Sequence, residues 1–575
     1  MNRNTELHFG QTPKINQKRS KFNRSCSNTT TFNAGDCVPL YVDSDILPGD
    51  TVQMDMAELV RMGTPIYPIM DNLYMDIYWF FVPHRLVWDH WQAFWGENED
   101  PWTQTTEYEI PQIEAPATTG WTEGTLADYM GIPTKVPGLS VNALPLRAYA
   151  KIWNDWFRDE NLKTNCHIYK DETTRTGVNS GTYTTDVELG GKPAKAAKFH
   201  GYFTGALPEP QKGTPVSIPL GTTAPVYTYD DLTIKSVSTT PGTRANSVTP
   251  IIWYSTAQTG GKWSAKNYEP STLTTDIEVP GIYVTGGGTA LSQNTYLDAT
   301  VMTGAKAYVT PANLMADLST ATAATINQLR TAFAIQKYYE NAGLHGTRYI
   351  EYLKSVFGVT SSDARMQRAE YLGGQRVPLN IDQIIQTSST DNTSPQGNTA
   401  GFSCTINRDS MFTKSFEEHG TLMCIGVVRT DRTYQQGLSK MWTRKKWTDF
   451  YNPFFANLGE MAILNENIYA QGNSTDKEAF GYQEAWAEYR YQENKVTGYM
   501  RSNATGSLDV WHFADNYNAL PQLSGTWIDE PTANIDRTIA VTSQLTHQFI
   551  GNFFFKTYYT RCMPVYSVPG LIDHV

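Results

Sequence analysis

Residues 70–102 read "MDNLYMDIYWFFVPHRLVWDHWQAFWGENEDPW". Ten of these 33 residues are aromatic, and the stretch holds five of the chain's fifteen tryptophans. A ligand cleft, a membrane belt or a large packed interface could each require so many rings in one place. The periodicity of the stretch favours one of these explanations.

The first part, residues 72–83, carries apolar residues on both faces of an extended chain, which predicts a strand buried on both sides. The positions that follow recur with helical spacing and end at Gly96: Leu86, Val87, His90, Trp91, Phe94 and Trp95. This pattern predicts an amphipathic helix. A buried strand leading into such a helix favours a core and an interface; the alternative is a platform on which sugars or bases stack.

The composition indicates a folded chain. Of 575 residues, 18% are charged and 40% are apolar, which is outside the range of disordered sequences. No long Gly/Ser or Pro linker divides the chain, so one large core with insertions is expected. The net charge of −11 makes the protein as a whole a poor general ligand for polyanions.

Neither export nor membrane insertion is expected. The first ten residues, MNRNTELHFG, lack the apolar segment of a signal peptide. The longest apolar runs, such as residues 77–82 and 423–428, are strand-sized and far below the roughly 18 residues of a membrane span. Six distant cysteines without a CxxC motif predict neither a disulfide framework nor a zinc site.

Four regions are predicted. Residues 1–25 form a basic arm, and residues 26–170 hold strands with helical insertions. Residues 171–310 are rich in Thr and Gly with short candidate strands, which indicates a β-rich surface insertion whose exposed tip is Gly286, Gly287 and Gly288. Residues 311–575 return to helices, at 325–343 and 348–358, and then to strands. A further helix is predicted in 144–162, with Pro145 in its first turn.

Catalysis is not expected, because no nucleophile elbow, metalloprotease, phosphate-loop or dinucleotide motif is present. Neighbouring carboxylates occur at Glu417 and Glu418, beside His419, and at Glu484 and Glu488, but chance explains them in a chain with 57 acids. His512 and Asp515 could form an acid–base or metal pair; a structural turn is the favoured alternative. No catalytic residue, metal or cofactor is therefore predicted.

A second cluster mixes cations with rings. Residues 429–455 contain Arg444, Lys445 and Lys446 among Trp442, Trp447 and other aromatic residues. Cations of this kind hold phosphates while rings stack on bases. The alternative is a solvated loop between strands.

Several long blocks resemble the major capsid protein of gokushovirus-type microviruses, which are small single-stranded DNA bacteriophages. They include "FNRSCSNTTTFNAGDCVPLYVDSDILPGDT", the opening stretch, "LPLRAYAKIWNDWFRDENL", "HGTRYIEYLKSVFGVTSSDARMQRAEYLGG" and "NPFFANLGE". The resemblance runs in order from Lys21 to the C-terminus and thins across 171–310.

The resemblance implies a mainly β fold: an eight-stranded antiparallel viral jelly roll with long helix-containing loops and a large β-rich insertion. It implies a virion protein that is assembled in the host cytoplasm into a T=1 icosahedral shell around single-stranded DNA. The implied partners are further copies, a small basic DNA-packaging protein, pilot and scaffolding proteins and a host surface receptor contacted by the insertion. The alternatives are a β-sandwich carbohydrate-active hydrolase and an adhesin; no calcium-type acidic loop or elongated repeat favours either.

The genome contact is expected to be electrostatic and incomplete. The arm carries Arg3, Lys14, Lys18, Arg19, Lys21 and Arg24 against one acid, Glu6, which gives +5 on a body of −16. A genome of thousands of nucleotides leaves on the order of tens of negative charges for each subunit. The arm, with Arg444, Lys445 and Lys446 as weaker candidates, cannot neutralise that charge. A second cationic component is therefore predicted, either a basic protein or polyamines and metal ions.

Overall fold

The computed structural model describes residues 18–97, 107–214, 216, 226–228, 233–238, 248–250, 308–311, 314–316, 326–346, 348–390 and 395–566. The chain divides into two compact units, Met1–Gly213 with Tyr338–Val575, and Thr214–Lys337. This division differs from the predicted limits of 171 and 310. Residues 171–213 belong to the first unit because they pair with it, as in the bridges Asp36–Lys195 and Ala197–Asp529.

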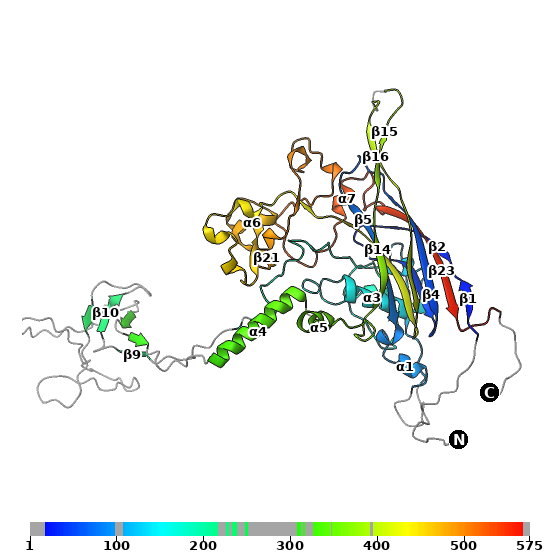
Figure 1. Cartoon of the computed structure of the whole chain (residues 1–575), viewed down its shortest axis with the longest axis horizontal. Coiled ribbons are helices and arrows are strands. Elements are labelled where there is room, and N and C mark those ends of the chain that lie inside the picture. Colours follow the sequence, from blue (N-terminus) through cyan, green and yellow to red (C-terminus); the bar gives the residue numbers. More distant parts are fainter. Residues whose placement is uncertain are drawn as a thin grey trace, which may run out of the picture. The chain divides into compact units, whose positions relative to one another are not determined.

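Two large antiparallel sheets form the centre of the first unit (Figure 1). The first sheet has the order β1-β23-β4-β17, with β2 also on β23: β1 Ser20–Asn23, β2 Cys26–Phe32, β23 Phe549–Arg561, β4 Thr51–Met62 and β17 Thr405–Ser415. The second sheet has the order β14-β5-β18-β3: β14 Glu370–Pro378, β5 Leu73–Pro83, β18 Gly420–Thr430 and β3 Val38–Ile46. The chain is mainly β with few helices, as predicted.

The main core lies between the two sheets. Along β23 every second residue is buried, because strand side chains alternate between faces. Phe555 of β23 meets Trp79 of β5 edge to face, with ring centroids 5.8 Å apart, and Phe412 of β17 contacts the same indole at 5.5 Å. Such edge-to-face pairs contribute about 0.5–1.5 kcal/mol beyond the area they bury.

The other face of the second sheet is also covered. Phe80 and Val82 of β5 and Ile425 of β18 pack in a second core with helix α3 (Leu144–Ile152) and the fully buried Trp153. The prediction that β5 is buried on both faces is therefore confirmed. The rings of the opening stretch that lie on this strand serve the two cores.

The continuous helix predicted for residues 86–95 is wrong. A 3-10 turn, η2 (His84–Leu86), and a separate short helix, α1 (Trp91–Phe94), replace it. The backbone N–H of Asp89 donates to the carbonyl of Lys170, so the helical ladder breaks there. Trp88 is buried in the second core and donates from its Nε1 to Glu172. A tertiary contact has overridden the local periodicity.

The other predicted helices are confirmed. α3 continues as a π turn over Trp153–Phe157. Helix α5 (Tyr349–Phe357) ends at Gly358, whose φ of 69° is the left-handed conformation that glycine adopts most easily. Helix α4 (Ile326–His345) runs two residues beyond the predicted end at Gly343.

Smaller elements fill the long connections of the first unit. Between β5 and β14 lie α2 (Leu126–Tyr129), η4 (Val187–Leu189) and a small sheet of β6 (Gln112–Glu114), β7 (Ser140–Asn142) and β8 (Arg175–Thr176). Between β14 and β17, the hairpin of β15 (Ile381–Ile385) and β16 (Thr399–Ser403) extends away from the sheets (Figure 1).

Residues 431–548, between β18 and β23, form a region that we call the lobe. It contains short strands and helices around its own core, which includes Tyr434, Ile463 and Phe480. Its strands are β19 (Thr433–Tyr434), β20 (Met461–Leu464), β21 (Ala479–Gln483) and β22 (Asn494–Lys495), and its α-helices are α6 (Asn465–Ile468) and α7 (Ala533–Asp536). Its 3-10 turns are Lys440–Trp442, Trp447–Asp449, Pro453–Phe455, Ser474–Lys477, Ala487–Tyr489, Gly498–Met500 and Asp509–Trp511.

The described part of the second unit contains short antiparallel strands. β10 (Thr233–Ser238) pairs with β11 (Val248–Pro250) and β12 (Tyr308–Pro311), and β9 (Val226–Thr228) pairs with β13 (Leu314–Ala316). These short strands agree with the short candidate strands predicted within residues 171–310. Gly286, Gly287 and Gly288 lie outside the described residues. Among the residues that the structure describes, none of the helices is long and apolar enough to cross a membrane.

A carboxylate is buried inside the main core. Glu58 of β4 is 2% exposed and accepts hydrogen bonds from Nε2 of Gln375 on β14, at 2.9 and 3.2 Å, and from Nδ2 of Asn407 on β17, at 2.8 Å. Burial raises the pKa of Glu58 to about 7, although the hydrogen bond from Asn407 lowers it in part. Glu58 thus links the two sheets through amide donors.

We expect Glu58→Gln to stabilise the protein above neutral pH. Because the pKa is raised in the folded state, ionisation of Glu58 lowers the free energy of unfolding. This loss is absent below the ordinary pKa of about 4.5 and is complete above pH 7. The variant should therefore gain about 1–3 kcal/mol over the wild type at pH 8 and nothing at pH 4. Urea unfolding at both pH values measures this gain.

The matched control is Asp55→Asn, on the opposite face of the same strand. It should show no gain that grows with pH. A difference between Glu58→Gln and the wild type that stays constant from pH 4 to pH 8 would contradict the interpretation.

Candidate functional site

The structure describes four of the six arm cations; Arg3 and Lys14 lie outside the described residues. Lys18 and Arg19 are exposed just before β1, and Lys21 is exposed on it, with its Nζ 4.3 Å from the centroid of the Tyr558 ring. Arg24 differs, because its Nη1 lies 2.7 Å from Oδ2 of Asp43. Three of these four cations therefore remain accessible to an anionic partner, and the fourth is engaged within the fold.

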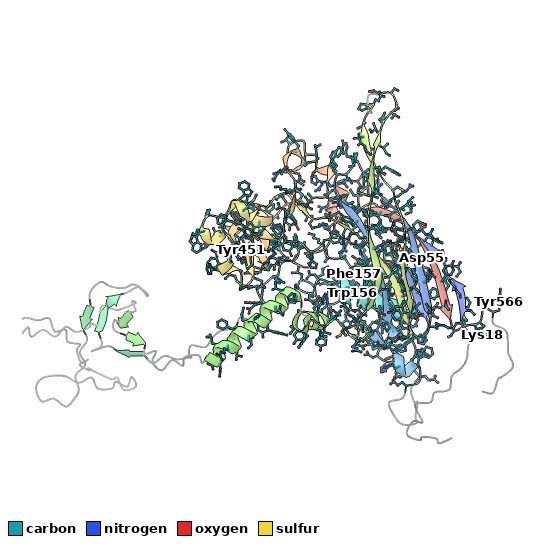
Figure 2. The ribbon with its side chains drawn as sticks, viewed as in Figure 1. Lys18, Asp55, Trp156, Phe157, Tyr451 and Tyr566 are labelled. Carbon is teal, nitrogen blue, oxygen red and sulfur yellow. The ribbon has the colours of Figure 1, made fainter. Side chains whose placement is uncertain are left out.

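The outward face of the first sheet carries further cations; Figure 2 shows where Asp55 of β4 and the nearby Lys18 lie on this side of the unit. The outward positions of β1, β4, β17 and β23 carry four cations and one carboxylate: Lys21, Arg61, Arg408, Lys556 and Asp55. Nζ of Lys556 is 4.0 Å from Asp55, and the Arg61 guanidinium lies 5.7 Å from the Phe402 ring. Sequence analysis missed this face, although strand alternation places these cations on one side.

The three cations predicted at 444–446 do not form one group. Nη2 of Arg444 is 3.4 Å from Glu488, and its guanidinium lies 4.4 Å from the ring of Tyr489, so it serves the lobe's own structure. Lys445 and Lys446 are exposed. The neighbouring Arg432 is fully internal and pairs with Glu530 and Asp515.

The rings beside these lysines are exposed. We call the following residues the ring cluster: Trp442, Trp447, Phe450, Tyr451 and Phe454. Phe454 is 94% exposed, and Trp442 and Trp447 are 72% and 70% exposed. Figure 2 shows Tyr451 on the lobe, far from Lys18 beside the first sheet. Exposed apolar groups gathered in this way mark interaction surfaces.

Apart from Glu417, which is exposed, the carboxylates and histidines considered for catalysis have structural partners. Glu418 accepts from Arg85, and the ring of His419 stacks on Trp95 at 4.7 Å. Glu484 pairs with Arg490.

His512 and Asp515 do not form a pair. His512 donates from Nε2 to the carbonyl of Met500, 2.7 Å away. Asp515 accepts from Asn534 and lies 3.8 Å from Nζ of Lys198. In the described residues, no group of three His, Cys, Asp or Glu side chains is placed to hold a metal ion.

Comparison with known proteins identifies the family. The model of the family described as "Capsid protein (F protein)" matches residues 11–571. The chain is 42% identical to Capsid protein VP1 of Spiroplasma virus 4 over 557 residues, which cover 96% of this chain and 95% of that protein. It is 42% identical to Capsid protein VP1 of Bdellovibrio phage phiMH2K over 574 residues, which cover 99% and 98%.

A third relative, Capsid protein VP1 of Chlamydia phage 1, is 37% identical over 595 residues, which cover 98% of this chain and 97% of that protein. The match thus spans both sheets, the described cations before and on β1, and the lobe. The chain belongs to the F-protein family of capsid proteins.

Proposed function

We propose that this chain is the major capsid protein of a small single-stranded DNA bacteriophage and assembles with its own copies into a T=1 icosahedral shell. The observation that carries the proposal is family membership over nearly the whole chain. The mainly β architecture agrees with it. The alternatives, a carbohydrate-active hydrolase or an adhesin, have no support in the relatives, which are all named as capsid proteins.

The strand pairing supports an eight-stranded jelly roll. β1 and β2 pair with the same edge of β23, and the register between Asn23–Tyr558 and Cys26–Phe555 advances by three residues on both sides. They therefore act as one interrupted strand. With that strand counted once, the two sheets contain four strand positions each, and all their pairings are antiparallel.

The outward face of the first sheet, together with Lys18 and Arg19, is the proposed genome-facing surface. Its cations attract phosphates without reading sequence, and the exposed Phe554 offers a ring for stacking. The net charge of −11 still leaves the genome charge unbalanced. A small basic DNA-packaging protein, or polyamines and metal ions, is the proposed further cationic component.

Replacing Lys18, Arg19 and Lys21 together by Gln should weaken binding to single-stranded DNA and flatten its salt dependence. Each phosphate contact contributes about 0.7 to the slope of log K against log salt, so loss of three should reduce the slope by about 2. Fluorescence titration with oligo(dT) at salt concentrations from about 50 to about 200 mM measures the slope.

The matched control replaces Lys135, Lys192 and Lys477 by Gln, three lysines of the first unit that lie on neither the first sheet nor the ring cluster. It changes the net charge equally. An equal fall in slope for both variants would show that total charge, rather than this surface, governs binding.

The ring cluster is proposed to be a contact between copies. Interfaces of permanent assemblies are enriched in aromatic residues and resemble a protein core cut in half. Arg444 is engaged with Glu488, so few free cations accompany the rings. This balance favours a protein partner over a nucleic acid, and Lys445 and Lys446 remain the weaker candidates for the genome contact.

The double change Trp447→Ser and Phe454→Ser should leave the subunit folded but prevent shell formation. Both side chains are mostly exposed, so their loss costs the isolated subunit less than about 0.5 kcal/mol each. Sedimentation and negative-stain images measure assembly, and circular dichroism measures folding. Lys445→Gln with Lys446→Gln is the control: assembly that fails in this variant while DNA binding also falls would assign the cluster to the genome.

The remaining roles are proposals from the family resemblance. Of the predicted insertion 171–310, residues 171–213 belong to the first unit; the remainder, with Gly286, Gly287 and Gly288 as its predicted tip, is proposed to project outward and contact the host surface receptor. Assembly takes place in the host cytoplasm with pilot and scaffolding proteins. No residue is proposed to be catalytic, so alanine at Glu417, Glu418, His512 or Asp515 acts on folding and assembly alone.

A further inference from the structure

Helices α3 and α5 have the same length but differ in how much of each is buried. Both contain nine residues, and seven residues of α3 are buried, whereas α5 buries none. The apolar residues of α5 nevertheless recur with helical spacing along one side: Tyr349, Tyr352, Leu353, Val356 and Phe357. None of the three cores of the described residues includes this side of α5.

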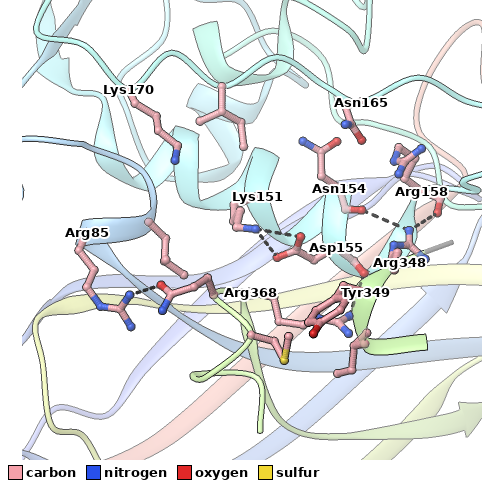
Figure 3. A pocket seen from close by; sticks show the side chains of 15 residues that line it. Arg85, Lys151, Asn154, Asp155, Arg158, Asn165, Lys170, Arg348, Tyr349 and Arg368 are labelled. Carbon is pink, nitrogen blue, oxygen red and sulfur yellow. Dashed lines mark hydrogen bonds and ion pairs between the residues drawn. The ribbon is translucent and has the colours of Figure 1, made fainter. Parts of the chain in front are cut away.

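The space beneath α5 is polar. A cavity of about 670 Å³ lies between the start of α5, at Tyr349 and Ile350, and residues 151–170 (Figure 3). Its lining contains one carboxylate, that of Asp155, and six cations: Arg85, Lys151, Arg158, Lys170, Arg348 and Arg368. Apolar side chains that filled this cavity would remove charged groups from water, which costs free energy. The cavity therefore cannot cover the apolar side of α5.

Hydrogen bonds fix both ends of the segment that carries α5. Nη2 of Arg348, the residue before the helix, donates to the carbonyls of Asn154 and Arg158, at 3.3 and 3.0 Å. After the helix, the backbone N–H of Ala369 donates to Oδ2 of Asp155, at 2.9 Å. Figure 3 shows the contact of Arg348 with Asn154 and Arg158. The helix is thus held in place by polar contacts while its apolar side stays uncovered.

A second hollow, of about 270 Å³, extends the apolar surface of α5 to the end of α4. Tyr338, Ala342, Tyr349 and Val356 are among the residues that line it, and Tyr338 belongs to the first unit. The ring centroids of Tyr338 and Tyr352 are 6.3 Å apart. We call the following residues the α5 patch: Tyr338, Tyr349, Tyr352, Val356 and Phe357.

The α5 patch is large enough to form part of a protein interface. Tyr338, Tyr349 and Phe357 are 52%, 63% and 62% exposed. Since one aromatic side chain buries roughly 150–250 Å², these three expose about 350 Å² of surface between them. A stable interface takes about 800 Å² from each partner. The three rings therefore supply nearly half of that area before their neighbours are counted.

The chemistry of α5 favours a protein as its occupant. Nucleic acids and lipid surfaces both favour several cations beside the apolar groups. The sequence of α5 contains one cation, Lys354, which is exposed. An apolar helix side with anchors at i, i+3, i+4 and i+7 is a common form of contact between proteins. The proposed shell places further copies of the chain around every subunit.

We propose that the α5 patch packs against a second copy of this chain. The inference rests on the proposed shell and adds a second surface to it. Around an axis of order higher than two, neighbouring copies meet through two different patches. The α5 patch is such a surface, because it differs from the ring cluster in its residues and in the elements that carry it.

Chemical labelling of the full-length protein tests the contact. Ser355 lines the hollow of the α5 patch and is exposed. The variant Ser355→Cys is made with Cys26→Ser and Cys562→Ser, which remove the two exposed native thiols. Iodoacetamide should modify the introduced thiol at least about tenfold more slowly in shells than in isolated subunits, because the core of an interface excludes solvent.

Thr413→Cys in the same background is the matched control. Thr413 is exposed on the outward face of the first sheet, so slowing of its thiol in shells assembled without DNA measures the effect of enclosure. Equal slowing of both thiols would overturn the proposal and leave the proposed shell intact. Protection of the Ser355→Cys thiol in isolated subunits by oligo(dT) would also overturn it, since the occupant would then be a nucleic acid. A wild type that stays monomeric in every condition would refute the shell and, with it, this contact.

The double change Tyr349→Ser and Phe357→Ser tests the contact independently. Both side chains are mostly exposed, so circular dichroism should show a folded subunit. Sedimentation should show at least about a tenfold loss of shells, because apolar anchors dominate the stability of interfaces. Tyr499→Ser with Leu508→Ser is the matched control, since both residues are exposed and lie outside the α5 patch and the ring cluster. An equal loss of shells in both double variants would overturn the proposal.

Discussion

The burial of β5 on both faces is the constraint on which the rest of this structure depends. Trp79 faces the first sheet, whereas the next residue, Phe80, faces the layer of α3 and Trp153. A strand in this position cannot slip by one residue, because every side chain would then enter the wrong core. The second sheet is thereby fixed between two apolar layers, and the long connections must supply the outer one.

This arrangement explains why the insertion after β5 is helical near the sheet and why it contains buried tryptophans. Trp88, Trp121 and Trp153 are all fully buried in the second core. Polar groups that enter this layer are satisfied by specific partners: the Trp153 Nε1 donates to the carbonyl of Lys195, and the Tyr149 hydroxyl donates to the carbonyl of Cys37. The first bond joins two parts of the insertion, and the second joins the insertion to the chain just before β3.

Much of the fold could be predicted from periodicity, but pairings between distant residues could not. The run of apolar residues on both faces around Trp79 and the helical spacing around Tyr149 predicted real elements because local pattern and tertiary environment agree there. The helix across Asp89 failed because the partner of that backbone N–H, the carbonyl of Lys170, lies 81 positions away in sequence. The partners of cations could not be predicted for the same reason. Arg24 and Arg444 pair with Asp43 and Glu488, which are distant from them in sequence. The cavity cations between residues 85 and 368 share no local pattern at all.

Because both faces of the second sheet are covered, other surfaces of the unit are left exposed. In the described part of the chain, the second sheet offers neither face to a partner, whereas the first sheet leaves its outward face open, with Ile406 and Ile550 exposed beside four cations. A face of this kind, part apolar and part basic, suits a flexible polyanion better than a packed protein surface, because bases and phosphates use both components. The ring cluster of the lobe differs from this face, because the neighbouring Arg444 is paired with Glu488 inside the lobe. The sheet that is left uncovered and the loops that are left apolar are thus the two separate surfaces that we propose for enclosing the genome and for holding neighbouring copies.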